Sequence, residues 1–224
     1  SFFANYNHIK SDGWRDNGSY DRKSGLLNAK VLTSGNNSLS FLANFVRLKA
    51  YIPSSISEDD FFNDPESAAY TWGASRGYES YDRGLLGISY NHHLSENFTN
   101  QTSIFLNFRN AYEPRPFDIL KEERLSAGAR TNFSLATSIF EKPADISFGA
   151  QYYNEWYETG TFENLYEDFD DLGSVRGERL SNNEQDRYYA NFFAQLNLNL
   201  TENLLVEAGL NFNTTGYSLD DFYT

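Results

Sequence analysis

The sequence predicts an all-β protein, specifically an antiparallel up-and-down transmembrane β-barrel of which about nine strands are present. Three observations support this class. Aromatic residues make up 17% of the chain, and β-branched, aromatic and leucine residues cluster between short runs of Asn, Gly, Ser and Asp. Many segments alternate apolar and polar residues, and the breaks between these segments alternate between short and long.

The composition excludes several classes of protein. A formal net charge of -13 and a pI near 4.6 argue against a nucleic-acid partner, because phosphate binding requires a basic surface. The absence of Cys removes disulfides, thiolate metal sites and thiol nucleophiles. No apolar run approaches the roughly 18 residues of a membrane helix, and the mean hydropathy of -0.61 suits a barrel in which lipid contacts only every second residue.

The stretch NFFAQLNLNLTENLLVEAGLNF, residues 191–212, shows the alternation most clearly. Leu196 and Leu198 belong to one face of a strand, Gln195 and Asn197 belong to the other, and the pattern resumes after a very short break. We therefore interpret this stretch as a hairpin. The segments with such a pattern are roughly 1–10, 22–33, 38–52, 81–93, 97–111, 121–136, 145–158, 187–200 and 203–215.

The connections between these segments alternate in length. In an up-and-down sheet successive connections lie at opposite ends, so this alternation predicts short periplasmic turns at one end and long extracellular loops at the other. The expected short turns are 34–37, 94–97, 137–144 and 201–203. The expected long loops are 11–21, 53–80, 112–120 and 159–186.

One of the two faces of the predicted strands is nearly free of charge. A charge that faces lipid at mid-depth costs about 2 to 4 kcal/mol, so a lipid-facing surface should lack charges. The outward set is Leu27, Ala29, Val31, Leu86, Ile88, Tyr90, Thr102, Ile104, Leu106, Phe108, Leu125, Ala127, Ala129, Thr131, Phe133, Leu135, Ile146, Phe148, Ala150 and Tyr152. The charges on the opposite set are Lys30, Arg109, Arg130, Glu155 and Glu207.

The strand predicted over 38–52 allows two readings. Either Arg47 and Lys49 share the face of Phe41 and Phe45, near the headgroups, or a bulge changes the face along the strand.

Aromatic residues are expected at the membrane interfaces, where amphipathic rings collect. The candidates are Trp14, Trp156 and Tyr188, although Trp156 could instead line the interior. The segment from Tyr188 to Leu200 would cross about 30 Å of membrane when tilted. Because single-chain bacterial barrels have even strand numbers, a nine-stranded chain is expected to be an internal piece of a longer barrel.

Several segments resemble the barrel region of TonB-dependent outer-membrane receptors, especially those of Bacteroidetes-type bacteria. The segments are NYNHIKSDGWRDNGSYDR (5–22), KAYIPSSISEDDF (49–61), SAAYTWGASRGYESYDRGLLGISYNH (67–92), NQTSIFLNFRNAYEPRPFDIL (100–120) and LLVEAGLNFNTTGYSLDDFY (204–223). This resemblance implies a barrel of about 22 strands with a plug in its interior, located in the bacterial outer membrane. It also implies import of an iron chelate or similar scarce nutrient, energised through TonB, with lipid and lipopolysaccharide as neighbours and no enzymatic activity. The plug and the remaining strands are expected in the parent protein.

Residues that face the interior, or lie at the bases of loops, are the candidates for substrate contact. Arginine suits an anionic chelate because its forked guanidinium matches carboxylates. The alternative is that these arginines pair with carboxylates of the plug or of neighbouring strands. The candidates are Arg76, Arg109, Tyr112, Arg115, Arg130 and Tyr153.

No metal, cofactor or catalytic site is predicted. The acidic segment 159–186 could supply oxygen ligands for calcium, but its spacing matches no EF-hand loop and favours a solvated surface loop. His92 and His93 are adjacent on a predicted strand and point to opposite faces, so they cannot bind one metal together. Two alternatives to active transport stay open: a passive porin-like channel, and a soluble secreted β-protein that binds glycans through its tyrosines.

Overall fold

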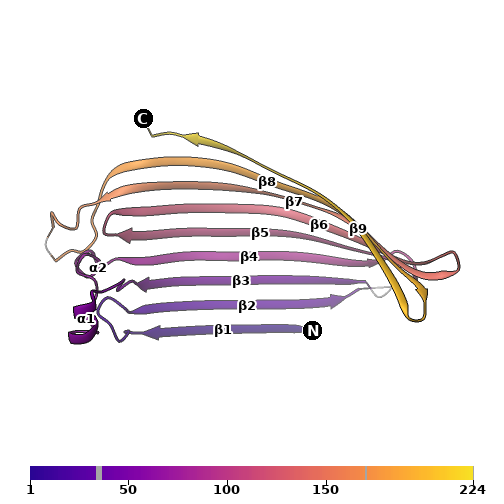
Figure 1. Ribbon diagram of the computed structural model, residues 1–224, viewed down its shortest axis with the longest axis horizontal. Helices are drawn as coiled ribbons and strands as arrows, with labels where there is room; N and C mark the ends of the chain where they lie inside the picture. The colour runs from indigo at the N-terminus through magenta and orange to yellow at the C-terminus, as the bar shows by residue number, and fades with distance from the viewer. Residues whose placement is uncertain (34–36, 170, 224) are drawn as a thin grey trace.

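A computed structural model describes residues 1–33, 37–169 and 171–223, and these form one antiparallel sheet of nine strands (Figure 1). The strands lie side by side in the order of the sequence, so each one pairs with its neighbours in the chain. Within the described residues the first and last strands do not pair with each other, and the sheet is therefore open. This arrangement confirms the predicted all-β, up-and-down class.

All nine predicted strands are present, and several extend further than the alternation suggested. The strands are β1 (Phe2–Ser11), β2 (Tyr20–Leu32), β3 (Ser38–Tyr51), β4 (Tyr78–His93), β5 (Phe98–Arg115), β6 (Asp118–Ile139), β7 (Lys142–Asn164), β8 (Arg176–Thr201) and β9 (Leu204–Asp221). Most of the additional residues lie at the loop end of the sheet, where polar side chains occupy both faces, and a few extend β6 and β7 at the turn end. Apolar alternation detects only the part of a strand that has one apolar face.

Short turns lie at one end of the sheet, the right-hand end in Figure 1, as predicted. They are residues 94–97, 140–141 and 202–203, while residues 34–36 of the fourth expected turn lie outside the described residues. At the other end, loops of residues 12–19, 52–77 and 165–175 connect the strands.

The expected long loop over 112–120 is wrong. Strands β5 and β6 continue to Arg115 and from Asp118, so only Pro116 and Phe117 connect them. Three charged residues and two prolines interrupt the apolar alternation over 112–120, so the pattern does not reveal the strands there. Bidentate contacts of 2.6 and 2.8 Å from the Arg115 guanidinium to the Asp118 carboxylate close the tip. The segment 159–186 is likewise mostly strand, with a loop of only 165–175.

Two short helices, α1 (Glu58–Asn63) and α2 (Tyr70–Ser75), lie in the loop between β3 and β4 and had no predicted counterpart. The side chain of Ser57 caps α1 by accepting a hydrogen bond from the backbone N–H of Asp60. Helices of this length show little apolar periodicity, which explains why the sequence did not reveal them. No helix among the described residues is long and apolar enough to span a membrane.

The two faces of the sheet differ sharply in character. Directly paired residues on neighbouring strands share a face, and the pairing through the middle of the sheet contains no register shift. One row of partners, on what we call the apolar face, is Ala29, Phe41, Ile88, Ile104, Ala129 and Tyr152. An adjacent row, on what we call the polar face, is Lys30, Ser40, Ser89, Ser103, Arg130 and Gln151. The predicted in-strand charges Lys30, Arg109, Arg130, Glu155 and Glu207 all belong to the polar face. At the loop end of the strands, charged residues such as Arg47 and Glu158 lie on the apolar face as well.

Strand β3 contains no bulge, which decides between the two readings of its face. Arg47 pairs with Lys23 and Asp82 in unshifted register, so it shares the apolar face with Phe41 and Phe45. Its guanidinium lies at the loop end of this face and contacts the Asp82 carboxylate at 2.6 and 3.0 Å. Arg47 and Lys49 therefore mark where the apolar band ends on the side of the long loops.

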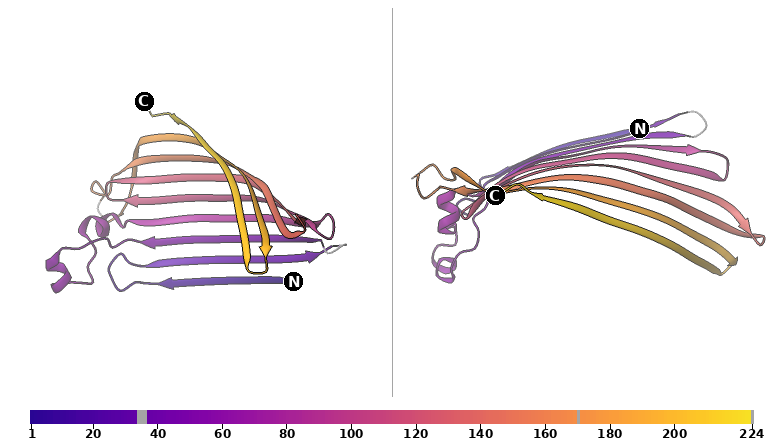
Figure 2. Two further views of the ribbon diagram at one scale, coloured as in Figure 1. Left: turned by 45° about the vertical axis from the view of Figure 1, so that its right-hand side comes forward. Right: turned by 90° about the horizontal axis from the view of Figure 1, so that it is seen from above.

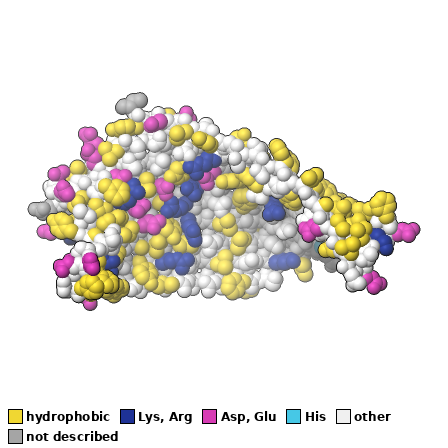
Figure 3. Space-filling view, in the orientation of Figure 1, with side chains coloured by type: hydrophobic (Ala, Val, Ile, Leu, Met, Phe, Trp, Pro, Cys, Tyr) yellow, Lys and Arg dark blue, Asp and Glu magenta, His cyan; other side chains and the backbone are white. Residues whose placement is uncertain are grey.

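The sheet curls so that β8 and β9 come forward of the other strands (Figure 2). Their hairpin overhangs the polar face, which is the face seen in Figure 3. Side chains pack closely on the polar face, where Ser126 and Glu155 are only 4% and 7% exposed to solvent. On the apolar face, Leu86 and Ile104 are 53% and 54% exposed although they are large and apolar. That exposure suits contact with an apolar environment.

The close packing of the polar face predicts a strong effect of Gly149→Ala. A Cβ at Gly149 would lie 2.2 Å from the carbonyl oxygen of Thr131 and 2.6 Å from the Phe193 ring, so the backbone of β6 would have to move. We expect a loss of about 1 to 3 kcal/mol in the free energy of unfolding, measured by urea denaturation in detergent micelles. Gly25→Ala is the control, because a Cβ there meets nothing within 4 Å. Equal effects of the two substitutions would contradict the packing argument.

Candidate functional site: an arginine-lined hollow on the polar face

A hollow of about 640 Å³ lies on the polar face, over the half of the sheet nearest the loops. Dark blue Lys and Arg side chains gather over the loop-side half of this face in Figure 3. The polar and charged side chains that line the hollow come from β3 to β7. They are Asn44, Arg83, Asn107, Arg109, Arg124, Ser126, Gln151, Tyr153 and Glu155.

Three arginines stand in one row across this hollow. Arg83 of β4 is the direct partner of Arg109 of β5, which in turn is the partner of Arg124 of β6. Direct partners in an antiparallel sheet lie about 5 Å apart, so three like charges repel one another unless anions compensate them. The positions of the nearby carboxylates therefore decide which arginine is available to a ligand.

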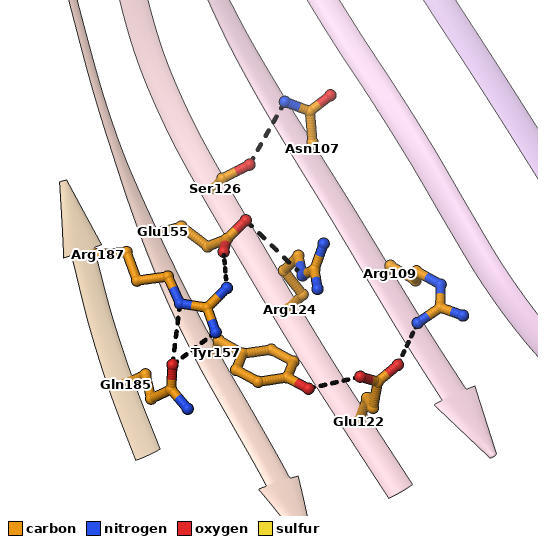
Figure 4. Close-up of polar contacts among 9 residues, drawn as sticks. All are labelled: Asn107, Arg109, Glu122, Arg124, Ser126, Glu155, Tyr157, Gln185 and Arg187. Atoms are coloured by element: carbon orange, nitrogen blue, oxygen red, sulfur yellow. Dashed lines mark hydrogen bonds and ion pairs between the residues drawn. The ribbon is translucent and has the colours of Figure 1, made fainter. Parts of the chain in front are cut away.

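Arg109 is compensated within the sheet. Its guanidinium donates to the Glu122 carboxylate (Figure 4). It also donates to the Glu79 carboxylate at 3.2 Å. Glu122 is also the acceptor for the hydroxyl of Tyr157, at 2.5 Å. Arg109 thus has two carboxylate partners, which hold its side chain in place.

Arg124 shares its only carboxylate partner among the described residues. Glu155, which is almost completely buried, lies between Arg124 at 3.7 Å and Arg187 at 3.1 Å (Figure 4). Arg187 also donates to the side-chain oxygen of Gln185 at 3.0 and 2.5 Å. The buried Nε of Arg124 has no hydrogen-bond acceptor among the described residues. One carboxylate therefore serves two guanidinium groups, which leaves net positive charge in the hollow.

Arg83 and Arg130 make no ion pair with any residue that the structure describes. Arg83 is exposed, and its guanidinium lies 5.8 Å from the ring of Tyr81. Arg130 lies on the same face, nearer the short turns, 5.4 Å from the ring of Phe193. Both retain donors for an anion that approaches the polar face.

The structure brings only some of the predicted contact residues together. Arg109 and Tyr153 line the hollow, and Arg130 lies on the same face outside it. Tyr112 is on the apolar face, because it pairs with Ser80, which in turn pairs with Lys49.

Arg76 and Arg115 belong to the loop end of the sheet. Arg76 ends α2 in a left-handed conformation, and its side chain packs against Gly173 of the loop between β7 and β8. Arg115 is held by Asp118 and lies over the ring of Phe117, 4.7 Å from its centre. Neither residue lines the hollow.

Sequence reasoning missed Arg83, Arg124, Glu155 and Arg187 as members of one cluster, although it placed Glu155 on the correct face. The alternation along each strand could have found them, since all four occupy positions whose side chains point to the polar face. Which residues pair across strands depends on register, however, and register follows from turn geometry more than from composition.

The loops above the sheet pack into one cluster. Arg15, in the loop after β1, donates to the carbonyl oxygens of Ser54 and Ser67, at 2.8 Å in each case for its terminal nitrogens. Ser174, in the loop after β7, donates to the carbonyl oxygen of Ser75 at 2.7 Å. These contacts join loops that are far apart in the sequence and form a cap at the loop end.

Within residues 1–33, 37–169 and 171–223, no group of three acidic or histidine side chains lies close enough together to hold a metal ion. Asp170, which contributed to the acidic pattern, lies outside the described residues. Desolvation raises the pKa of the Tyr166 phenol, and its hydrogen bond of 2.9 Å to the Glu167 carboxylate acts in the same direction.

Of the predicted interfacial aromatics, two lie on the apolar face. Trp156 pairs with Leu125 on one side and with Asp186 of β8 on the other, and Tyr188 is the next outward residue of β8 toward the short turns. Trp156 is 47% exposed and Tyr188 is 43% exposed. Trp14 is in the loop between β1 and β2 and is 69% exposed. Their contact with a membrane interface stays a prediction.

No protein-family model matches the chain, and no curated protein matches it either. Solved structures do match. The ferric citrate transporter FecA in its unliganded form superimposes with a TM-score of 0.79 at 14% identity over 99% of this chain. The ferric-catecholate import receptor Fiu from E. coli K12 in its open form gives a TM-score of 0.75 at 11% identity over 98% of this chain. BauA, the ferric preacinetobactin receptor from Acinetobacter baumannii, gives a TM-score of 0.74 at 11% identity over 97% of this chain.

The chain covers much less of these proteins than they cover of it. It spans 33% of FecA, 41% of Fiu and 37% of BauA, which is less than half of each. At such low identity the likeness establishes the fold, and the chain has the architecture of part of a receptor β-barrel.

Proposed function

We propose that the chain forms part of the wall of an outer-membrane transporter that imports an anionic iron chelate, or a comparable scarce nutrient, with energy supplied through TonB. The observation that carries the proposal is the two-faced sheet: an exposed apolar band on one side and an arginine-lined hollow on the other. An apolar band suits lipid, and guanidinium groups suit carboxylate or catecholate oxygens. The proposal also draws on the fold shared with proteins whose names refer to ferric chelates.

The parent protein, under this proposal, supplies the remaining strands and a plug domain. The nine strands make an open sheet, and the matched structures are more than twice as long as the chain. A complete barrel removes unpaired strand edges, which lipid does not tolerate. Lipid and lipopolysaccharide would contact the apolar face, while the plug and the substrate would face the arginines.

Uptake by intact bacteria tests the proposal. Cells that carry or lack the gene would be supplied with radioactive iron as ferric citrate or as a ferric catecholate. Active transport predicts uptake that requires both the gene and tonB. Uptake that persists without tonB would instead support a passive porin-like channel. Recovery of the protein in the soluble fraction without detergent would favour the secreted glycan-binding protein and contradict a membrane location.

Arg83 provides a test at the level of a single residue. Because Arg83 has no carboxylate partner among the described residues, Arg83→Gln should remove an available cation without leaving a carboxylate unpaired. We expect about a tenfold weaker Kd for the transported chelate, since hydrogen bonds to charged groups contribute about 1.5 to 3 kcal/mol. Arg83→Lys should retain part of the affinity.

The matched control is Arg115→Gln, which removes a cation that the Asp118 carboxylate already neutralises at 2.6 Å. Chelate affinity should change little in this variant. If Arg115→Gln weakened binding more than Arg83→Gln, the hollow would not be the site of substrate contact.

A further inference from the structure

The apolar face carries a polar pocket that has no part in the proposed contact with the substrate. A pocket of about 370 Å³ lies at its loop end, just above the apolar band. Its outward-facing lining consists of three cations, two carboxylates and three uncharged residues: Arg47, Lys49, Lys121, Asp82, Glu123, Ser80, Asn110 and Tyr112. We refer to it as the rim pocket. It opens on the opposite side of the sheet from the arginine-lined hollow.

Lys49 supplies uncompensated positive charge in the rim pocket. Its ammonium lies 4.1 Å from the centre of the Tyr78 ring and 4.8 Å from that of Tyr51, and it makes no ion pair within the described part of the chain. The other two cations do have partners, since Arg47 contacts Asp82 and Lys121 contacts Glu123, each at 2.6 Å. The tyrosine rings therefore position a cation that is free to bind an anion.

A further cation lies beside the pocket. Lys23 of β2 is the direct partner of Arg47, is exposed, and makes no ion pair among the described residues. Asp82 and Glu123 of the pocket belong to the same row, and beyond the pocket the row is acidic, with Glu158 on β7 and Glu184 on β8 as successive partners. In a chain of net charge -13, this gathering of cations on one part of one rim is a local feature.

An apolar groove of about 770 Å³ lies below the pocket on the same face. Small side chains such as Ala29, Ala43 and Ala127 form its floor, and larger ones such as Leu86 and Ile104 form its walls. On β2, Gly25 lies between the groove and the cations, and a side chain at this position would meet open space. Successive outward residues are about 7 Å apart along a strand. Arg47 and Lys49 follow Ala43 of the groove by two and three such steps, so the two cations stand roughly 13 to 20 Å from the groove along β3.

We propose that the rim pocket binds the phosphate of a phosphorylated glycolipid of the outer leaflet, with an acyl chain of that lipid in the groove. This inference rests on the proposed outer-membrane location. Lys49 and Arg47 offer several donors to phosphate oxygens, and the unpaired ammonium of Lys49 distinguishes this part of the rim from the acidic part over β7 and β8. A phosphate near the loops and an acyl chain nearer the short turns match the order of residues along β2, where Gly25 leaves open space between Lys23 and Leu27 of the groove.

Lipid binding to the purified full-length parent protein tests the inference. The probes are lipid A with both phosphates and lipid A from which the phosphates have been removed, with affinities measured in nanodiscs by native mass spectrometry. We expect about a tenfold lower affinity of Lys49→Gln for the phosphorylated form, and little change for the dephosphorylated form. Lys49→Arg should preserve most of the affinity because it keeps the charge. Lys30→Gln on the polar face is the control and should bind both lipids as the wild type does.

Two results would overturn the inference: equal affinity of the wild type for both forms of lipid A, or an unchanged affinity of Lys49→Gln for the phosphorylated form. A folded barrel, checked by its altered gel mobility without heating, shows that a loss of binding is not a loss of structure. Failure of the proposed function would appear differently, as a protein that does not fractionate with the outer membrane or cells that show no tonB-dependent uptake.

Discussion

Replacement of Ile88 by arginine is expected to lower the free energy of unfolding by about 2 to 4 kcal/mol, because the charge would face lipid near mid-depth. Ile88 is 41% exposed on the apolar face and pairs with Phe41 and Ile104, so no carboxylate of the same row can neutralise an arginine there. The change is best measured by guanidinium-induced unfolding in phospholipid vesicles, followed through tryptophan fluorescence.

Ser89→Arg is the matched control, because Ser89 is the next residue on the same strand and points to the polar face. Its hydroxyl accepts from Gln101 at 3.2 Å and from Ser103 at 2.9 Å, so its loss should cost about 1 kcal/mol or less. Similar losses for both substitutions would mean that the apolar face does not contact lipid. A single cysteine at each position, introduced into a chain without cysteines, would allow the same contrast to be tested by labelling with a water-soluble maleimide.

Glu155→Gln is expected to cost about 2 to 3 kcal/mol of unfolding free energy, since it leaves two guanidinium groups without their shared carboxylate. Glu155 is nearly buried between Arg124 and Arg187, at 3.7 and 3.1 Å. Each arginine is 38% exposed, so water recovers part of the loss and the expected cost lies below that of a fully buried pair. Urea unfolding in detergent micelles measures the change.

Glu158→Gln supplies the comparison, because Glu158 lies on the same strand, is exposed and makes no ion pair with the described residues. It should change stability by less than about 0.5 kcal/mol. A second comparison is the double variant Glu155→Gln with Arg187→Gln, which should lose less than the sum of the two single variants because one of the stranded cations has gone. Strict additivity would show that Glu155 and Arg187 do not stabilise each other.

The sequence was informative about the faces of the sheet and less informative about its ends. Alternation places Ile104 and Arg130 on opposite faces correctly, because a charge and an isoleucine have opposite costs in lipid. Between the apolar band and the long loops both faces are polar. The alternation of apolar and polar residues therefore no longer distinguishes strand from loop there. For this reason the extended tip around Pro116 and Phe117 was expected to be a long loop.

The candidate site was predictable only in part, because its members meet through register. Parity places Arg109, Arg124 and Glu155 on one face, but the sequence does not say that Glu155 stands opposite Arg187. Nor does it distinguish Arg109, which has two carboxylate partners, from Arg83, which has none among the described residues. Those distinctions require the hydrogen-bonded pairing of the strands.

The chain-order arrangement of the nine strands also bears on how such a sheet can assemble. Each strand meets a partner that precedes or follows it directly, and the connections at one end are as short as residues 140–141 and 202–203. Closing such short connections costs little chain entropy, so hairpins can form locally and then add to a growing edge. The sheet can therefore lengthen one hairpin at a time, and each finished strand becomes the template that aligns the next.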